Sequence, residues 1–208
     1  MSGAVARTIR RRVEYEITKR KGSRFITAAL PLDTEAGSDG ERHIQQQVRE
    51  MLEERRALFP NACHHCYAYT TMDGREYCSD DGEPHGTAGK PILAAMQRAK
   101  LVDVCMVVSR IFGGTLLGTG GLIRAYGASA QETIENAEII DKIPMTTLHV
   151  FAPFAHVDTV KHGCTKFLGE VVAQDYSDRA SFVVRIPTEN SAAFQDLLRS
   201  RSSGGIAL

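Results

Sequence analysis

The chain has 208 residues, of which 43% are hydrophobic and 24% are charged, and its formal net charge at pH 7 is zero. This balance is typical of a globular protein with one large or two small domains, and it argues against a dedicated nucleic-acid binder, whose pI usually exceeds about 9. Five cysteines form an odd set, which argues against a disulfide framework, and no apolar run approaches the ~20 residues of a membrane helix. We therefore expect a cytoplasmic protein.

Charge is distributed unevenly along the chain. Residues 1–24 contain two acids and eight basic residues, which are Arg7, Arg10, Arg11, Arg12, Lys19, Arg20, Lys21 and Arg24. A basic end on a neutral protein is typical of a surface that faces a polyanion. A solvated terminus next to a first strand is an equally good interpretation, and the sequence leaves both open.

Apolar spacing predicts an alternation of strands and helices in the first two thirds of the chain. The strand at 102–112 is apolar on both faces, which predicts a central position in a sheet. In chain order we expect strands at 13–17 and 24–30, a polar loop at 33–41, a helix at 41–58, strands at 63–71 and 75–80, a helix from Pro91, the strand at 102–112, a glycine-rich turn at 113–121 and a helix at 122–139.

The last third of the chain has the order β-α-β-β-α, with room for a short closing strand only at 204–208. The expected elements are a strand at 145–153, a helix at 156–167, strands at 169–176 and 180–187 and a helix at 189–200. This order predicts a small ferredoxin-like split βαβ unit. We therefore predict an α+β chain with two domains, 1–142 and 143–208.

Two glycine-rich segments resemble nucleotide-binding loops, but both fail the test of spacing. The segment "GEPHGTAGKP" has Pro84 where a phosphate-binding loop needs its first glycine, and Pro91 where that loop needs a hydroxyl. The segment "GTGGLI" has Ile123 where a dinucleotide-binding turn needs its third glycine. A glycine-rich turn that leads into a helix can still bind an anion, with charge from Lys90, Arg110 or Arg124. The alternative is that these glycines serve tight turns and close packing.

The segment "CHHC" contains half of a zinc site, Cys63 and Cys66. If this segment is a strand, the alternation of side chains puts Cys63 and His65 on one face and His64 and Cys66 on the other, which separates the ligands. We therefore favour a structural role for both cysteines and predict no metal and no cofactor.

The acid-rich segment around His85 offers weak catalytic candidates. His85, with Asp81 and Glu83 beside it in the sequence, could act as a general base, but no nucleophile stands in a recognisable motif. The alternative, which we favour, is that these acids cap helices and accept hydrogen bonds from backbone N–H groups.

With these segments laid out, the chain resembles the IMPACT family in its bacterial form. The resemblance rests on "KGSRFIT", "CYAY", "SDDGEPHGTAGKPIL" and "VVSRIFGGTLLGTGGLIRAYG", in this order, within residues 13–136. It implies a first domain like domain 2 of ribosomal protein S5, a second domain like the ferredoxin-like modules of elongation factor G, and a link to translation. It also implies a binding surface built from Asp80, Asp81, Glu83, Gly86, Thr87, Gly89, Lys90, Pro91, Arg110, Gly113, Gly114, Gly118, Gly120, Gly121, Arg124 and Tyr126.

Two positions depart from the family pattern. His85 stands where a small hydroxyl residue is common, and Ile111 stands where an aromatic ring is usual. We expect a binding protein that contacts RNA, the ribosome or a translation factor. One alternative is an enzyme acting on a phosphorylated or acidic small molecule, with Mg²⁺ held by Asp80, Asp81 and Glu83. Another is a protein–protein adaptor.

Overall fold

The computed structural model describes residues 6–34, 40–202 and 205–207, and it divides into two compact units, Met1–Lys142 and Ile143–Leu208. Within the described ranges, no helix is both long enough and apolar enough to cross a bilayer. The elements of the first unit are β1 (Ala6–Ile9), β2 (Val13–Glu16), β3 (Arg24–Pro31), α1 (Gly40–Leu58), β4 (His64–Thr70), β5 (Glu76–Ser79), α2 (Gly89–Arg98), β6 (Val104–Ile111), α3 (Thr119–Glu135) and β7 (Ile139–Lys142).

A five-stranded antiparallel sheet forms the centre of the first unit, in the order β2-β3-β6-β4-β5. The predicted hairpin of the first two strands is confirmed, because β2 pairs with β3. The predicted central strand is also confirmed, because β6 lies between β3 and β4 and is buried from Val104 to Arg110. A strand with neighbours on both edges and cover on both faces accounts for the continuous apolar run in the sequence.

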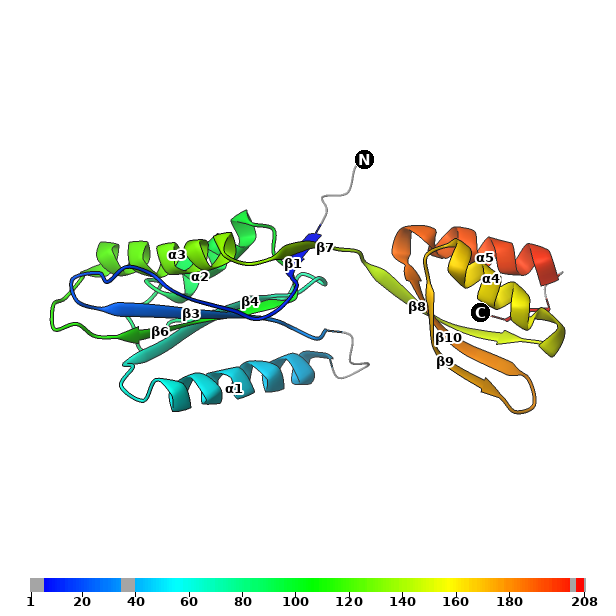
Figure 1. Cartoon of the computed structure of the whole chain (residues 1–208), viewed down its shortest axis with the longest axis horizontal. Coiled ribbons are helices and arrows are strands. Elements are labelled where there is room, and N and C mark those ends of the chain that lie inside the picture. The colour runs from blue at the N-terminus through cyan, green and yellow to red at the C-terminus, as the bar shows by residue number, and fades with distance from the viewer. Residues whose placement is uncertain (1–5, 35–39, 203–204, 208) are drawn as a thin grey trace. The chain divides into compact units, whose positions relative to one another are not determined.

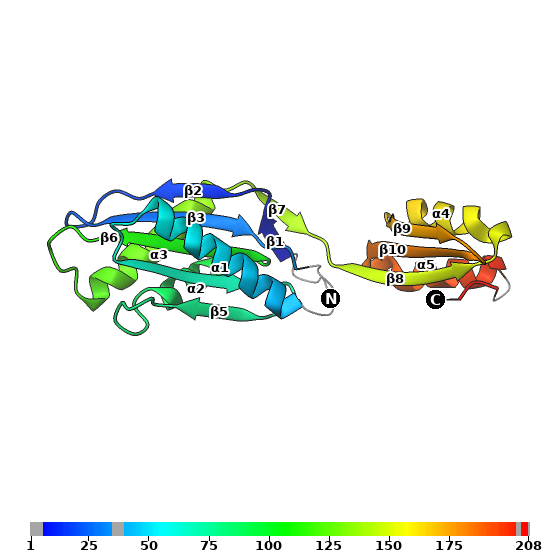
Figure 2. The same ribbon diagram turned by 90° about the horizontal axis from the view of Figure 1, so that it is seen from below.

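Helices cover both faces of this sheet (Figures 1 and 2): α1 lies on one face, and α2 and α3 lie on the other. Helix α1 packs through Ile44, Val48 and Met51, which recur every three or four residues and so form one buried stripe. On the opposite face, Phe25 and Met106 join the apolar side of α2 and α3 in a larger core. Burying one such side chain contributes roughly 1.5–3 kcal/mol.

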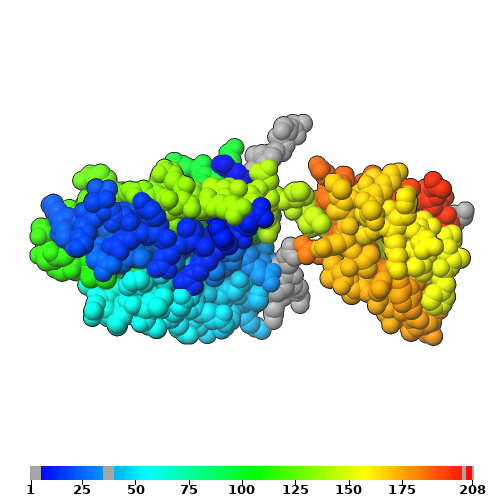
Figure 3. All heavy atoms as spheres, in the orientation of Figure 1, coloured from blue at the N-terminus to red at the C-terminus, as the bar shows by residue number. Residues whose placement is uncertain are grey.

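A two-stranded ribbon of β1 and β7 completes the first unit. In Figure 3 the blue N-terminal segment and the yellow-green segment of β7 lie side by side on the surface. The sequence did not predict this ribbon, and the prediction that the last helix runs to 139 was wrong, because α3 ends at Glu135. Ile134 and Ile139 continue the apolar spacing of the helix, and for this reason the sequence predicted a longer one. In the structure Asn136 is the C-cap, so the helix ends before Ile139.

The second unit contains β8 (Met145–Ala152), a short 3₁₀ turn (Phe154–His156), α4 (Val157–Lys166), β9 (Glu170–Tyr176), β10 (Ala180–Pro187) and α5 (Thr188–Ser202). The predicted order β-α-β-β-α is therefore confirmed. Its antiparallel sheet has the order β8-β10-β9, and both helices pack against one core that includes Val184 and Phe194. The described part of the predicted closing strand is a single bridge, in which Ala207 pairs with Phe151 on the free edge of β8.

Most other predicted boundaries agree with the structure to within a few residues. The second helix begins at Gly89 rather than at Pro91, so the proline lies in its first turn. Most of the predicted polar loop at 33–41, residues 35–39, lies outside the described residues.

Candidate functional site

The acid-rich loop that joins β5 to α2 is organised by Asp80. Its carboxylate accepts hydrogen bonds from the backbone N–H groups of Gly86 (2.7 Å), Ala88 (3.0 Å) and Gly89 (2.8 Å). Helix α2 has Ala88 at its N-cap, a residue without a polar side chain, so Asp80 satisfies the free N–H groups at this end instead. Burial alone would raise the pKa of Asp80, but the three N–H groups outweigh it and hold the pKa below its ordinary value.

Replacing Asp80 by alanine should lower the free energy of unfolding of the first unit by about 2 kcal/mol, because three N–H groups lose a charged acceptor. Since folding lowers the pKa of Asp80, its contribution is present above the unfolded value of about 3.9 and is lost as the pH falls below it. Urea unfolding of wild type and variant should therefore differ at neutral pH and converge in acid. Glu53→Ala, which removes an exposed carboxylate on α1, is the control, and an equal loss in both variants would contradict the prediction.

Asp81 ties the same loop to strand β4. Its carboxylate accepts a hydrogen bond from the backbone N–H of His65 at 2.6 Å, and its carbonyl oxygen lies 2.7 Å from Nδ1 of His64. Asp81 has a φ of 41°, in the left-handed region that short polar residues tolerate better than most. The two aspartates therefore fix the backbone of the loop, as expected for acids that accept backbone hydrogen bonds.

Glu83 is the third acid of the loop, and its side chain points into the unit. Its Oε1 lies 2.5 Å from Nη1 of Arg110 and accepts a hydrogen bond from the hydroxyl of Tyr126 at 2.8 Å. The thiol of Cys66 in turn donates to the Tyr126 oxygen at 3.3 Å. Burial raises the pKa of Tyr126 and raises the pKa of Cys66 to about 12, so both groups stay protonated at neutral pH. The structure thus joins residues of both long sequence motifs in one buried polar cluster.

Sheet register explains why Arg110 meets this cluster. Arg110 on β6 stands opposite Phe25 on β3 and opposite His64 on β4, so the three residues form one row across the sheet. The rings of Tyr126 and Phe25 pack edge to face, with their centroids 5.1 Å apart. The guanidinium of Arg110 lies 5.6 Å from the centroid of Phe25 and 5.7 Å from that of Phe112.

The residues of "CHHC" are divided between the two faces of the sheet. The Nδ1 of His65 lies 3.0 Å from the hydroxyl of Ser109, which also accepts a hydrogen bond from the buried guanidinium of Arg55 on α1. Cys66 belongs to the core on the opposite face, and Cys63 is exposed. Among the described residues, no three His, Cys, Asp or Glu side chains are grouped to hold a metal ion.

The weak catalytic candidates have three different environments. Asp81 is bound to the backbone of β4, and Glu83 is paired with Arg110. The side chain of His85 is 90% exposed, with its Nδ1 3.8 Å from Asp80. The hydroxyl of Thr87 donates to the carbonyl oxygen of Pro84, a bond within the loop.

The second glycine-rich segment forms the turn between β6 and α3. Gly113 packs directly on the backbone of the turn between β2 and β3, where a β-carbon would lie 1.9 Å from the carbonyl carbon of Gly22. Gly118 is the N-cap of α3 with a φ of 72°, and it has no side chain to accept the first N–H groups of the helix. Gly120 and Gly121 follow in the first turn. The structure therefore confirms that these glycines serve a tight turn and close packing. Anion binding at the uncapped helix end stays a prediction.

A cleft of about 400 Å³ separates the acid-rich loop from this second turn, and we call it the apolar cleft. Glu83 and Arg110 contribute to its lining together with exposed apolar side chains of the turn. The full lining is Cys63, His64, Gly82, Glu83, Pro84, Arg110, Phe112, Leu116, Leu117, Gly118, Thr119 and Leu122.

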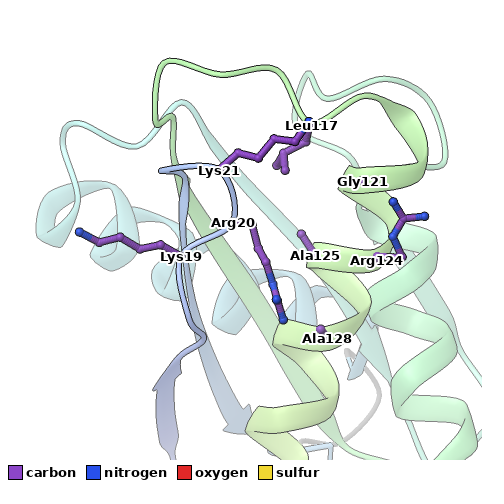
Figure 4. Close-up of a pocket in the computed structure, with 8 residues that line it drawn as sticks. All are labelled: Lys19, Arg20, Lys21, Leu117, Gly121, Arg124, Ala125 and Ala128. Atoms are coloured by element: carbon purple, nitrogen blue, oxygen red, sulfur yellow. The ribbon is translucent and has the colours of Figure 1, made fainter.

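A second hollow, of about 570 Å³, lies between the β2–β3 turn and α3, and we call it the basic groove (Figure 4). It is lined by Lys19, Arg20, Lys21, Leu117, Gly121, Arg124, Ala125 and Ala128. Arg20 extends along α3 toward Ala128 and Lys21 reaches toward Leu117, whereas Lys19 points away from the helix. No acidic residue is among the lining residues.

The basic groove accounts for only part of the basic N-terminal segment. Arg10, Arg12 and Arg24 form ion pairs with Glu138, Glu54 and Glu16, respectively. Among the described residues, none of the four basic side chains of the groove forms an ion pair with a carboxylate. The basic residues of the N-terminal segment thus include two groups. Arg10, Arg12 and Arg24 form ion pairs within the protein, whereas Lys19, Arg20 and Lys21 line the basic groove.

The family resemblance pointed to the two walls of the apolar cleft and to Arg124, but it missed other lining residues. Phe112, Leu116 and His64 line the apolar cleft, and Lys19 to Lys21 line the basic groove. The excess of basic residues in the N-terminal segment was the signal in the sequence for the basic groove. Lys90, another residue of the implied surface, lies in the first turn of α2 and is exposed.

Comparison with known proteins gives consistent matches over nearly the whole chain. Residues 21–134 match the model of the Impact N-terminal domain, and residues 150–204 match a domain of unknown function, DUF1949. An IMPACT family member of Haemophilus influenzae is 35% identical over 78% of this chain and 84% of its own. The IMPACT family member YigZ of Escherichia coli is 32% identical over 90% of this chain and 89% of its own. A crystal structure described as a hypothetical protein superposes with a TM-score of 0.71 at 29% identity, covering 97% of this chain and 95% of the other.

Proposed function

The chain belongs to the IMPACT family, and from this premise we propose that it is a cytoplasmic binding protein that contacts RNA of the translation machinery. The basic groove is the observation that carries this proposal. Its four cations have no acid among the lining residues, so their charge is available to phosphate groups. The five cysteines, all free, suit a reducing compartment.

The architecture of the two units supports the same proposal by analogy. We assign the second unit to the ferredoxin-like βαββαβ fold, which the sheet order β8-β10-β9 and the bridge from Ala207 to the outer edge of β8 support. We assign the first unit to the fold of ribosomal protein S5 domain 2, as the resemblance implies. Both folds recur in proteins that bind RNA, although fold alone does not define function.

The alternative of a Mg²⁺-dependent enzyme receives less support from the site. It requires Asp80, Asp81 and Glu83 to bind one cation together. Each of these carboxylates already accepts hydrogen bonds from a different part of the protein. A metal ion would have to replace these bonds, and each replacement would cost stability of the loop.

Salt dependence of RNA binding tests the proposal. Wild-type protein should bind a short single-stranded RNA with an affinity that falls linearly with salt on a double logarithmic plot. The triple variant Lys19→Ala, Arg20→Ala, Lys21→Ala should bind more weakly at low salt and show a shallower slope, by up to about 2 units for three lost phosphate contacts on a single strand. Fluorescence anisotropy across a range of KCl concentrations measures both quantities.

The matched control removes the same charge elsewhere. Arg49→Ala, Arg56→Ala and Arg98→Ala, combined in one variant, delete three exposed cations on α1 and α2. This variant should keep most of the wild-type slope. Equal slopes for both triple variants would refute the role of the basic groove. If the protein binds no RNA but co-sediments with a purified translation factor, the result would favour the alternative of a protein–protein adaptor.

A further inference from the structure

We propose that the apolar cleft accepts one unstacked nucleobase of the RNA strand whose phosphates lie in the basic groove. This inference rests on the proposed function, and it adds to it a site for a base. The lining of the apolar cleft differs from that of the basic groove, so the cleft suits a different part of the RNA than the phosphates. Phosphate binding explains four cations, but it does not explain an apolar hollow next to them.

The walls of the apolar cleft suit a flat apolar ring. Leu116 is 80% exposed and Phe112 is 42% exposed, and both lie on the turn that forms one wall. Pro84 and Gly82 form the other wall. Large apolar side chains beside a concave surface are typical of a ligand site, and the volume of about 400 Å³ falls in the usual range for small ligands. Aromatic side chains such as Phe112 stack on single-stranded bases without strong dependence on sequence. Leu116 offers an apolar surface against which the same ring can pack.

The Arg110–Glu83 pair lines the cleft, and one atom of each side chain lacks a hydrogen-bond partner among the described residues. Arg110 is only 6% exposed, and its Nε is buried without a hydrogen-bond partner among the described residues. Both hydrogen bonds to the Glu83 carboxylate fall on Oε1, so no described residue donates to Oε2. A nucleobase edge carries N–H donors next to carbonyl or ring-nitrogen acceptors, so it can pair with such a carboxylate and guanidinium after a small adjustment of the side chains.

The positions of the two hollows fit a single strand of RNA. Leu117 lines both of them, and the first turn of α3 separates them, with Gly118 and Thr119 on the cleft side and Gly121 on the groove side. The uncapped N-terminus of α3 therefore lies where a phosphate would pass from one hollow to the other. A base that unstacks from the neighbouring bases at this point would enter the apolar cleft. The phosphates of the neighbouring nucleotides would stay in the basic groove.

The double variant Phe112→Ala, Leu116→Ala tests the inference, because both side chains are exposed and their loss should leave the fold intact. We expect its affinity for a short single-stranded RNA to fall about 10-fold, as for the loss of one stacked base, while the salt slope stays at the wild-type value. An RNA with one aminopurine should change its fluorescence on binding to wild type and change it much less with the variant. The matched control is Phe154→Ala, Leu168→Ala in the second unit, where the side chains are 54% and 76% exposed.

Failure of the inference is distinguishable from failure of the proposed function. Salt-dependent binding with unchanged affinity in the Phe112→Ala, Leu116→Ala variant would overturn the base site and leave the basic groove in place. An equal loss in the control variant would also overturn it. Absence of salt-dependent RNA binding by the wild type would overturn the proposed function itself. A variant with the wild-type slope, about 10-fold weaker binding and a much smaller aminopurine signal would support the base site.

Discussion

Replacing Glu83 by alanine should lower the free energy of unfolding of the first unit by about 3–5 kcal/mol, the largest effect that we expect of a single substitution. The change leaves the guanidinium of Arg110 buried without its counter-charge and removes the acceptor of the Tyr126 hydroxyl. Phe25 and Phe112 would then be the main neighbours of this cation, and their rings compensate for only part of the loss. Urea unfolding followed by circular dichroism measures the difference.

Two further variants separate the effect of a buried charge from that of a lost ion pair. Glu138→Ala removes the exposed ion pair with Arg10 and should cost less than about 1 kcal/mol. Glu83→Leu combined with Arg110→Met removes both buried charges and should recover much of the stability lost in Glu83→Ala. If Glu83→Ala and Glu138→Ala cost the same, the buried pair does not have the role that we assign to it.

Replacing Gly113 by alanine should cost about 3 kcal/mol and should also weaken RNA binding. The added β-carbon would lie 1.9 Å from the carbonyl carbon of Gly22 and 2.2 Å from the amide nitrogen of Ser23, and backbone atoms cannot move aside as a side chain does. The β2–β3 turn would have to shift, and Lys19 to Lys21 of the basic groove would shift with it. Urea unfolding and the anisotropy assay measure the two effects on the same preparation.

Gly114 provides the control for this position. It has a φ of 86°, and apart from its own chain neighbours no atom of the described residues lies within 4 Å of a β-carbon placed on it. Gly114→Ala should therefore cost only the strain of a left-handed backbone, about 1 kcal/mol. If Gly113→Ala is as mild as Gly114→Ala, the close approach of the two turns is less rigid than the structure indicates.

The sequence was sufficient to predict most of the fold because the longer elements carry their own patterns. The continuous apolar run of β6 and the single stripe of α1 each indicate the burial of the element that contains them. Strands β1 and β7 have four residues each, and each becomes a strand only by pairing with the other. No local pattern in either segment indicates its partner.

The candidate site was predictable only in part, for a related reason. The role of Asp80 as an acceptor of N–H groups follows from an acid close to the start of a helix, and the sequence favoured it. The contact of Glu83 with Arg110 and Tyr126 depends on sheet register and on the packing of α3, which are properties of the whole unit. The basic groove was visible as charge, but only the ion pairs of Arg10, Arg12 and Arg24 show which cations remain free.

The β1–β7 ribbon has a consequence for how the protein is made. Strand β1 leaves the ribosome first, whereas its partner β7 is the last strand of the same unit to be synthesised. Arg7 also hydrogen-bonds through its backbone with Lys100 and Val102, which emerge when most of the unit has already been translated. A nascent chain that stops before Ile139 therefore has a five-stranded sheet without its ribbon and an N-terminal strand with an open edge. The ribbon can therefore form only after β7 has followed the rest of the first unit out of the ribosome.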